Sequence, residues 1–372
     1  QDIVHTRASG ATQTNSSGLV AYAPNNLLPR SNEFTHTDWD SYARMTAGAA
    51  VSPTGETNAS EITSSAGSIY DALGGTLSNL CISIYAKKNT CDFLTLSGGN
   101  PSGLSATFDL TDGTVAQTVG VSNPKISDEG NDWYRCSVGV STANYIQFSA
   151  RATGTQAGTR TTGVYVYGAQ VERTFDLTAG PQAYKTTDGA DTLQAPRFDY
   201  DKDGNSLGLL VEEARTNLQT QAINLSGNYS TSAASFVADS TVSPTGAKDA
   251  DRLYESATNT YHRLEYTAST SANTLSFYAK KGALRDWMYT YLWSGSAHAE
   301  YAFFNLVTGQ VGTTSGVGAT GMEDVGNGWY RCWVYRTTTG YDAARVGLAN
   351  ADNAFTHAGD TSAYVSLWGI QE

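Results

Sequence analysis

Charged residues are scarce in this chain of 372 residues, and positively charged ones are the scarcer kind. Asp, Glu, Lys and Arg make up 16% of the residues, whereas a soluble domain usually has about a quarter. The 35 acidic residues outnumber the 23 Lys and Arg, which gives a formal net charge of -12. Such a chain repels phosphate backbones and anionic lipid. We therefore expect neither nucleic acid nor a membrane surface as a partner.

Long apolar runs and helical periodicity are also missing. No run reaches the length that spans a bilayer, so no membrane insertion is expected. No secretory signal is visible after Gln1. The chain is instead rich in Gly, Ser, Thr and Tyr, with 37 Gly and 22 Tyr. Short strands joined by tight turns have this composition, so the sequence predicts an all-β protein.

Cysteine is rare, and the four cysteines form no zinc motif. Cys136 and Cys332 fall inside predicted strands and are interpreted as small buried hydrophobic residues. Cys81 and Cys91 flank a predicted hairpin. Two hypotheses stand for them, a disulfide between the two and a pair of free thiols.

Catalytic motifs are absent as well. The sequence has no Gly-x-Ser-x-Gly, phosphate loop or dinucleotide fingerprint. The best enzymatic pair is His298 with Glu300, but the strand alternation places Glu300 on the inward face. We therefore expect no enzyme activity. The histidines show no metal-binding spacing; they are His5, His36, His262, His298 and His357.

An internal repeat is the strongest signal in the chain. Val51–Gly55 returns as Val242–Gly246, and Gly130–Cys136 returns as Gly326–Cys332. Trp133 and Trp329 occur in both copies, which indicates a packing role rather than a functional one. The repeat predicts four segments: an N-terminal arm (1–24), a first module (25–172), a connector with a β-hairpin (173–216) and a second module (217–372). Each module is interpreted as an antiparallel β-sandwich of jelly-roll type.

Aromatic residues distinguish the second module from the first. Four rings alternate with Met288, Thr290 and Leu292, so they share one face of a strand. The first module has Cys91 to Ser97 there, with Leu94 and Leu96 aligned with Thr290 and Leu292. The sequence predicts an aromatic surface that serves glycan binding, a subunit interface or ordinary core. Its predicted members are Trp287, Tyr289, Tyr291, Trp293, Tyr301, Arg331, Trp333 and Tyr335.

One acidic segment matches part of a calcium loop. Asp199, Asp201 and Asp203 alternate before Gly204, like the first half of an EF-hand loop. The twelfth position from Asp199 is Leu210, and a start at Asp201 that brings Glu212 to that position loses the glycine. The other interpretation is a hairpin turned at Asp203-Gly204.

The segment PRFDYD (196–201), followed by LGLLVEEARTNL (207–218), resembles a segment found in tail, fibre and other virion proteins of tailed phages and prophages. The modules, each with Tyr-Ala-Lys and a Trp-Tyr-Arg-Cys motif, are similar to carbohydrate-binding-module jelly rolls. The first module departs from that family's pattern at Asp132, where glycine is usual.

This resemblance implies a virion structural and adhesion protein, on the capsid or a tail fibre, that presents its modules to host-surface polysaccharide. It also implies contacts with other virion proteins and a homo-oligomer such as a trimer. Two alternatives stay open. One is a purely architectural decoration protein, and the other is a capsule depolymerase, which the lack of a short β-helix repeat disfavours.

Overall fold

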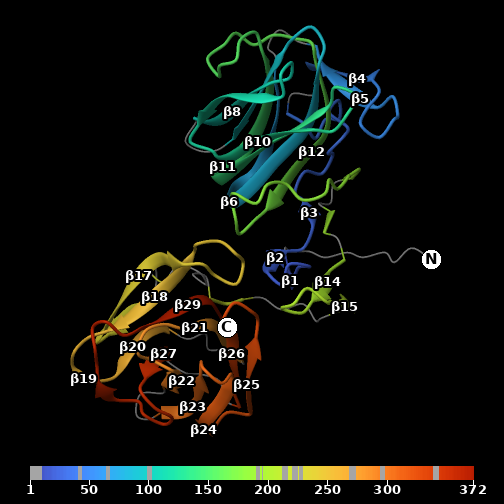
Figure 1. Cartoon of the computed structure of the whole chain (residues 1–372). Helices are drawn as coiled ribbons and strands as arrows, with labels where there is room; N and C mark the ends of the chain where they lie inside the picture. Colours follow the sequence, from blue (N-terminus) through green and yellow to red (C-terminus); the bar gives the residue numbers. More distant parts are fainter. Residues whose placement is uncertain are drawn as a thin grey trace. The chain divides into compact units, whose positions relative to one another are not determined.

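The chain folds into antiparallel sheets (Figure 1), which confirms the all-β prediction. The computed structural model describes the chain apart from residues 1–10, 41–43, 64–67, 99–102, 190–192, 195, 212–216, 220–224, 226–228, 268–273, 294–297 and 338–342, and apart from the side chains of 193–194 and 298–299. No α-helix occurs among the described residues, so none of these residues belongs to a membrane-spanning helix.

The chain divides into two compact units. Unit 1 comprises residues 1–13 and 21–197, and unit 2 comprises residues 14–20 and 198–372. Each unit contains one repeated module. The predicted arm and connector are shared between the units, because residues 14–20 belong to unit 2 and the connector is divided after residue 197.

Unit 2 is built from two six-stranded sheets. Sheet 1 has the order β16 (Ser230–Ser232), β20 (His262–Thr267), β27 (Ala343–Ala349), β22 (Trp287–Trp293), β23 (His298–Asn305) and β24 (Gln310–Ser315). Sheet 2 has the order β17 (Ala234–Thr241), β18 (Ala250–Glu255), β29 (Tyr364–Gln371), β21 (Thr274–Lys281), β26 (Trp329–Tyr335) and β25 (Ala319–Asp324).

One core joins these two sheets. Phe304 from sheet 1 and Phe277 from sheet 2 meet edge to face, with ring centroids 5.8 Å apart. Cys332 lies in the same core and is fully buried, as predicted. Two sheets that face each other across one core form a β-sandwich. The short strands β19 (Asn259–Thr260) and β28 (His357–Ala358) pair beside it.

Unit 1 has one large sheet of nine strands. Its order is β4 (Met45–Ala50), β5 (Ala59–Ile62), β12 (Val164–Arg173), β6 (Ser68–Lys88), β11 (Tyr134–Arg151), β7 (Phe93–Gly98), β8 (Leu104–Asp109) and β9 (Thr114–Val119), with β10 (Ser122–Asp128) on β11. The long strands β6 and β11 correspond to β20 with β21 and to β26 with β27. The unit therefore repeats the strand pairing of unit 2, and Cys136 lies in its core.

Small strand pairs complete the chain. They join β1 (Thr12–Thr14) with β2 (Val20–Tyr22), β3 (Asn25–Asn26) with β13 (Leu193–Gln194), and β14 (Phe198–Tyr200) with β15 (Ser206–Leu209).

The repeated tryptophans make the same hydrogen bond in both units. Trp133 donates its indole N–H to the carbonyl of Val51 at 3.1 Å, and Trp329 donates to the carbonyl of Val242 at 3.0 Å. Both indoles are 1% exposed. Each one thus fastens the repeated Ser-Pro-Thr-Gly turn to the sheet, which confirms their predicted packing role.

A second pair of hydrogen bonds, also present in both units, holds the start of each module. The backbone N–H of Leu27 donates to the carbonyl of Val171, and the side-chain oxygen of Asn26 accepts from the N–H of Val171. Unit 2 repeats both bonds with Leu218 and Asn217 on Glu372. An asparagine therefore ties the first residues of each module to its last strand in unit 1 and to the residue just after that strand in unit 2.

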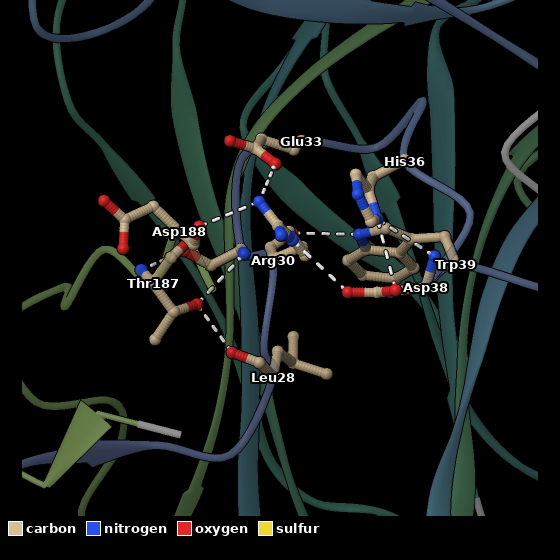
Figure 2. Close-up of polar contacts among 9 residues, drawn as sticks. Leu28, Arg30, Glu33, His36, Asp38, Trp39, Thr187 and Asp188 are labelled. Atoms are coloured by element: carbon tan, nitrogen blue, oxygen red, sulfur yellow. Dashed lines mark hydrogen bonds and ion pairs between the residues drawn. The ribbon is translucent and has the colours of Figure 1, made fainter. Parts of the chain in front are cut away.

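The segment after Asn26 is held down by polar contacts (Figure 2). Arg30 bridges Glu33 at 2.6 Å and Asp38 at 3.3 Å, while its carbonyl accepts the indole N–H of Trp39. The hydroxyl of Thr187 donates to the carbonyl of Leu28 at 2.6 Å. These contacts join residues from the start of the module to residues of the predicted connector within unit 1.

The predicted connector packs on β12 in the same unit. The N–H of Gln182 donates to the Glu172 carboxylate at 2.8 Å, and the N–H of Lys185 donates to the Gln170 side chain at 2.7 Å. Tyr184 packs against Tyr167, with ring centroids 5.9 Å apart. Residues 174–188 therefore form a strap that packs on the side chains of Tyr167, Gln170 and Glu172 of β12.

The hypothesis of a disulfide is wrong. Cys81 and Cys91 are both free thiols, and both are buried. Cys81 lies within β6, whereas Cys91 follows that strand and points its sulfur toward the carbonyls of Phe93 and Arg151. Burial raises the pKa of both thiols.

Candidate functional site

The aromatic residues of β22 share one face, as the alternation predicts. Met288 and Leu292 point into the sandwich core, while Tyr289 and Tyr291 lie in a separate cluster on the outer face of sheet 1. The neighbouring strand β23 adds Tyr301, which pairs with Tyr291 across the strands. Half-buried Trp287 and Trp293 stand at the two ends of the row.

The middle of this face is not open to a ligand. Phe355, from the segment after β27, packs on Tyr289, Tyr291 and Tyr301 with ring centroids 5.1, 5.6 and 5.1 Å away. Tyr289 and Tyr291 are 0% and 1% exposed as a result. They belong to a small internal core, so the ordinary-core interpretation holds for these two residues, and the glycan-binding and interface interpretations are wrong for them.

Sequence comparison misplaced the matching strand of the first module by two residues. Leu94 pairs with Phe108 in unit 1 as Met288 pairs with Phe304 in unit 2. Leu94 therefore corresponds to Met288, not Thr290. The positions of Tyr289 and Tyr291 are then held by Thr95 and Ser97, whose short polar side chains are buried. The aromatic cluster is thus a feature of unit 2 alone.

A pocket opens beside the covered cluster, on the outer face of sheet 1. Trp293, the last residue of β22, forms one wall, and Arg345 of β27 lies next to it. The other walls come from β16, β20 and the start of β27. The lining residues are Ser230, Glu265, Tyr266, Thr267, Trp293, Ala343 and Arg345.

Arg345 contacts three of the side chains in and beside this pocket. Its guanidinium stacks on the Trp293 indole, 4.5 Å from the ring centroid, and its Nη1 donates to the Tyr291 hydroxyl at 3.1 Å. Its Nε donates to the Glu265 carboxylate. The Glu265 side chain is 31% exposed, and Arg263 approaches the same carboxylate at 3.6 Å. An indole, a carboxylate and hydroxyl groups therefore line one recess.

The structure separates the predicted site into two groups. Arg331, Trp333 and Tyr335 lie on β26 in sheet 2, and β26 has no hydrogen-bonded neighbour in sheet 1. The indole of Trp333 lies over Gly321 of β25, in the space that a Cβ there would occupy. The expectation that these residues extend the β22 surface is wrong, because the two strands belong to opposite sheets of the sandwich.

The acidic segment forms the hairpin of the second interpretation. Asp201 accepts hydrogen bonds from the backbone of Asp203 and Asn205 in the turn between β14 and β15. Asp199 accepts from the backbone of Thr14, and Asp203 pairs with Lys202. The three carboxylates serve separate local contacts and do not form a cluster with three metal-ligand atoms. Glu212 lies outside the described residues.

The fold assembles a buried polar cluster that the sequence did not indicate. Glu255, His262 and His357 place three potential metal-ligand atoms within 4.8 Å of one another, although the histidines are far apart in sequence. His357 contacts the Glu255 carboxylate at 2.6 Å, and Arg285 contacts it at 2.5 Å. Burial alone would raise the pKa of Glu255, but these partners outweigh burial and lower it.

The contacts of this cluster favour a structural role. The two ring nitrogens of His262 face the carbonyl oxygens of Ala233 at 2.8 Å and His357 at 3.1 Å. The guanidinium of Arg285 already neutralises Glu255, and a positive charge there opposes a metal cation. The cluster ties the ends of β18, β20 and β28 together.

The geometry of Glu300 does not support the pairing of His298 with Glu300 as an enzymatic site. This carboxylate is 3% exposed and accepts hydrogen bonds from the N–H and hydroxyl of Thr337. The side chain of His298 lies outside the described residues.

A scan against protein-family models finds no match for the chain, and a search of the curated proteins finds none. The pocket's chemistry therefore has to carry the functional argument. Aromatic rings bind the apolar faces of sugar rings, and carboxylates and hydroxyls bind sugar hydroxyls. Of the residues that sequence analysis did not find, Glu265 and Arg345 matter most, and only their pairing across β20 and β27 identifies them.

Proposed function

We propose that the chain is a virion structural and adhesion protein of a tailed phage, and that the pocket at Trp293 binds host-surface glycan. The observation that carries the binding proposal is the meeting of Trp293, Arg345 and Glu265 in one recess of unit 2. In unit 1, Thr95 and Ser97 take the places of Tyr289 and Tyr291, the two rings that precede Trp293 on this face of β22.

The virion location rests on the sequence resemblance. Many copies on one particle would strengthen a weak individual site through effective concentration. The net charge of -12 suits an exposed, soluble appendage. No catalytic role is part of this proposal.

A glycan array with isothermal titration of the hits tests the binding proposal. We expect Trp293→Ala to weaken binding at least tenfold, because stacking on the indole is lost. Trp333→Ala is the matched control, since it removes a half-buried indole from the other sheet. Equal binding by wild type and Trp293→Ala would refute the assignment of the pocket.

Light scattering on the same proteins distinguishes the architectural alternative. A stable oligomer that binds no glycan, and that dissociates on the Trp293→Ala change, would make this surface a subunit interface. A glycan-binding protein whose assembly is unaffected by the change supports the proposal.

A further inference from the structure

Two arginines share one carboxylate on the outer face of sheet 1. Arg345 donates its Nε to Glu265, and the Nη2 of Arg263 approaches the same carboxylate oxygen at 3.6 Å. Among the residues that the structure describes, no other carboxylate contacts either guanidinium. Two positive charges therefore face one negative charge, and the group of Arg263, Glu265 and Arg345 has a net positive charge.

The two guanidinium groups still have N–H donors to offer. Arg263 stacks on the rings of Tyr261 and Tyr291, but its contact with Glu265 is longer than a hydrogen bond, and its Nε has no hydrogen-bond partner among the described residues. Arg345 stands in the wall of the pocket. The side chains are 15% exposed for Arg263 and 10% exposed for Arg345. A guanidinium presents its donors in a planar fork that fits a carboxylate, so the arginine pair can bind a second one.

Unit 1 builds the same three strands without these charges. In unit 2, Tyr291 pairs with Arg345, which pairs with Glu265. In unit 1, the corresponding row runs from Ser97 through Gln147 to Tyr70. The residue two places before Tyr70, where unit 2 has Arg263, is Ser68. The sandwich therefore forms without the two arginines, and their presence in unit 2 needs another reason.

From this arrangement we infer that the glycan bound at the pocket is acidic, and that Arg263 and Arg345 together hold its carboxylate. The inference rests on the proposed glycan binding. A uronate or a sialic acid would bring the negative charge that the arginine pair lacks, whereas a neutral hexose would not. The net charge of -12 opposes an anion at long range. At about 0.15 M salt, however, charges more than about 8 Å away are largely screened.

The test uses pairs of oligosaccharides that differ only at C6, namely oligomers of glucose against glucuronate and of galactose against galacturonate. Titration of the whole chain at about 0.15 M salt should give at least tenfold tighter binding of the acidic member of a pair. We expect Arg263→Gln to weaken acidic binding about tenfold and to leave neutral binding within about twofold, because a charged contact is lost. Glu265→Gln should act in the opposite direction and tighten acidic binding about threefold, since it removes the competing carboxylate.

Arg252→Gln is the matched control, because it removes an arginine that stacks on Tyr364 in sheet 2. It should leave the preference unchanged. Wild type that binds both members equally, or prefers the neutral one, would overturn the inference while glycan binding stands. An acidic preference that is the same in Arg263→Gln would also overturn it. A chain that binds no member of any pair, and no glycan on the array, would instead remove the proposed function. Should Arg263→Gln fail to fold, the wild-type preference and Glu265→Gln still decide the question.

Discussion

Glu172 offers the sharpest test of the energetics of unit 1. It lies on β12 under the strap of residues 174–188, is 1% exposed, and accepts the backbone N–H of Gln182. Burial raises its pKa to about 7 from the ordinary value of 4.5, although the Gln182 N–H and Arg135 act against burial. The folded protein therefore holds a proton on this carboxyl to a higher pH than the unfolded chain does.

The direction of the pH effect follows from linkage. Because the folded pKa is raised, the stabilising effect of the proton is complete below pH 4.5 and is lost as the pH rises through 7. One pKa unit corresponds to about 1.4 kcal/mol, so the rise from 4.5 to about 7 gives a loss of about 3.5 kcal/mol at most. A domain of this size changes its Tm by about 2–4 °C for each kcal/mol.

Glu172→Gln should remove this loss. The amide stays neutral at every pH and still offers an oxygen to the Gln182 N–H. We expect the variant to match wild type near pH 4.5 and to exceed its Tm by about 7–14 °C at pH 8. Scanning calorimetry between these pH values measures the difference for the unit 1 transition.

Asp71 serves as an internal reference in this experiment. Burial and the nearby Asp40 raise its pKa to about 7 as well, so it contributes the same pH trend to wild type and variant. The difference between the two proteins isolates Glu172. A Tm difference that does not change with pH, or a variant less stable than wild type at pH 8, would refute the reasoning.

Two further changes test the backbone and the aromatic cluster. Asp132 has a φ of +63° and an exposed side chain, so Asp132→Gly should raise the free energy of unfolding by about 0.5 kcal/mol in urea titration. Gly328→Asp makes the reverse exchange in unit 2, where φ is +76°, and stabilisation by that change would contradict the argument. Phe355→Ala should lower unit 2 stability by about 2 kcal/mol and make the tyrosine fluorescence accessible to acrylamide. An unchanged quenching profile would mean that Phe355 does not cover Tyr289.

Local patterns were enough to predict several features of the structure. The Val-Ser-Pro-Thr-Gly and Trp-Tyr-Arg-Cys repeats identified two similar modules, because the same turn and the same indole hydrogen bond are built twice. Strand alternation placed the rings of β22 on one face, since side chains in a strand point to opposite faces in turn. Turn chemistry also offered the hairpin at Asp203-Gly204 as an alternative to calcium.

Sequence alone could not show which residue packs on the aromatic face of β22. Phe355 is an isolated aromatic residue in a loop, and nothing local indicates that it packs on Tyr289 and Tyr291. The free state of Cys81 and Cys91 likewise depends on the strands around them.

The sequence by itself determined the all-β class, the duplicated module and the aromatic character of β22, because composition, repetition and alternation are properties of neighbouring residues. Only the tertiary structure decided that Trp333 belongs to the opposite sheet from Trp293, and that Arg345 and Glu265 meet beside Trp293. Strands distant in sequence become neighbours only when the sheets form. The pairing of β20 with β27, which brings Glu265 opposite Arg345, therefore has no signature in either strand alone.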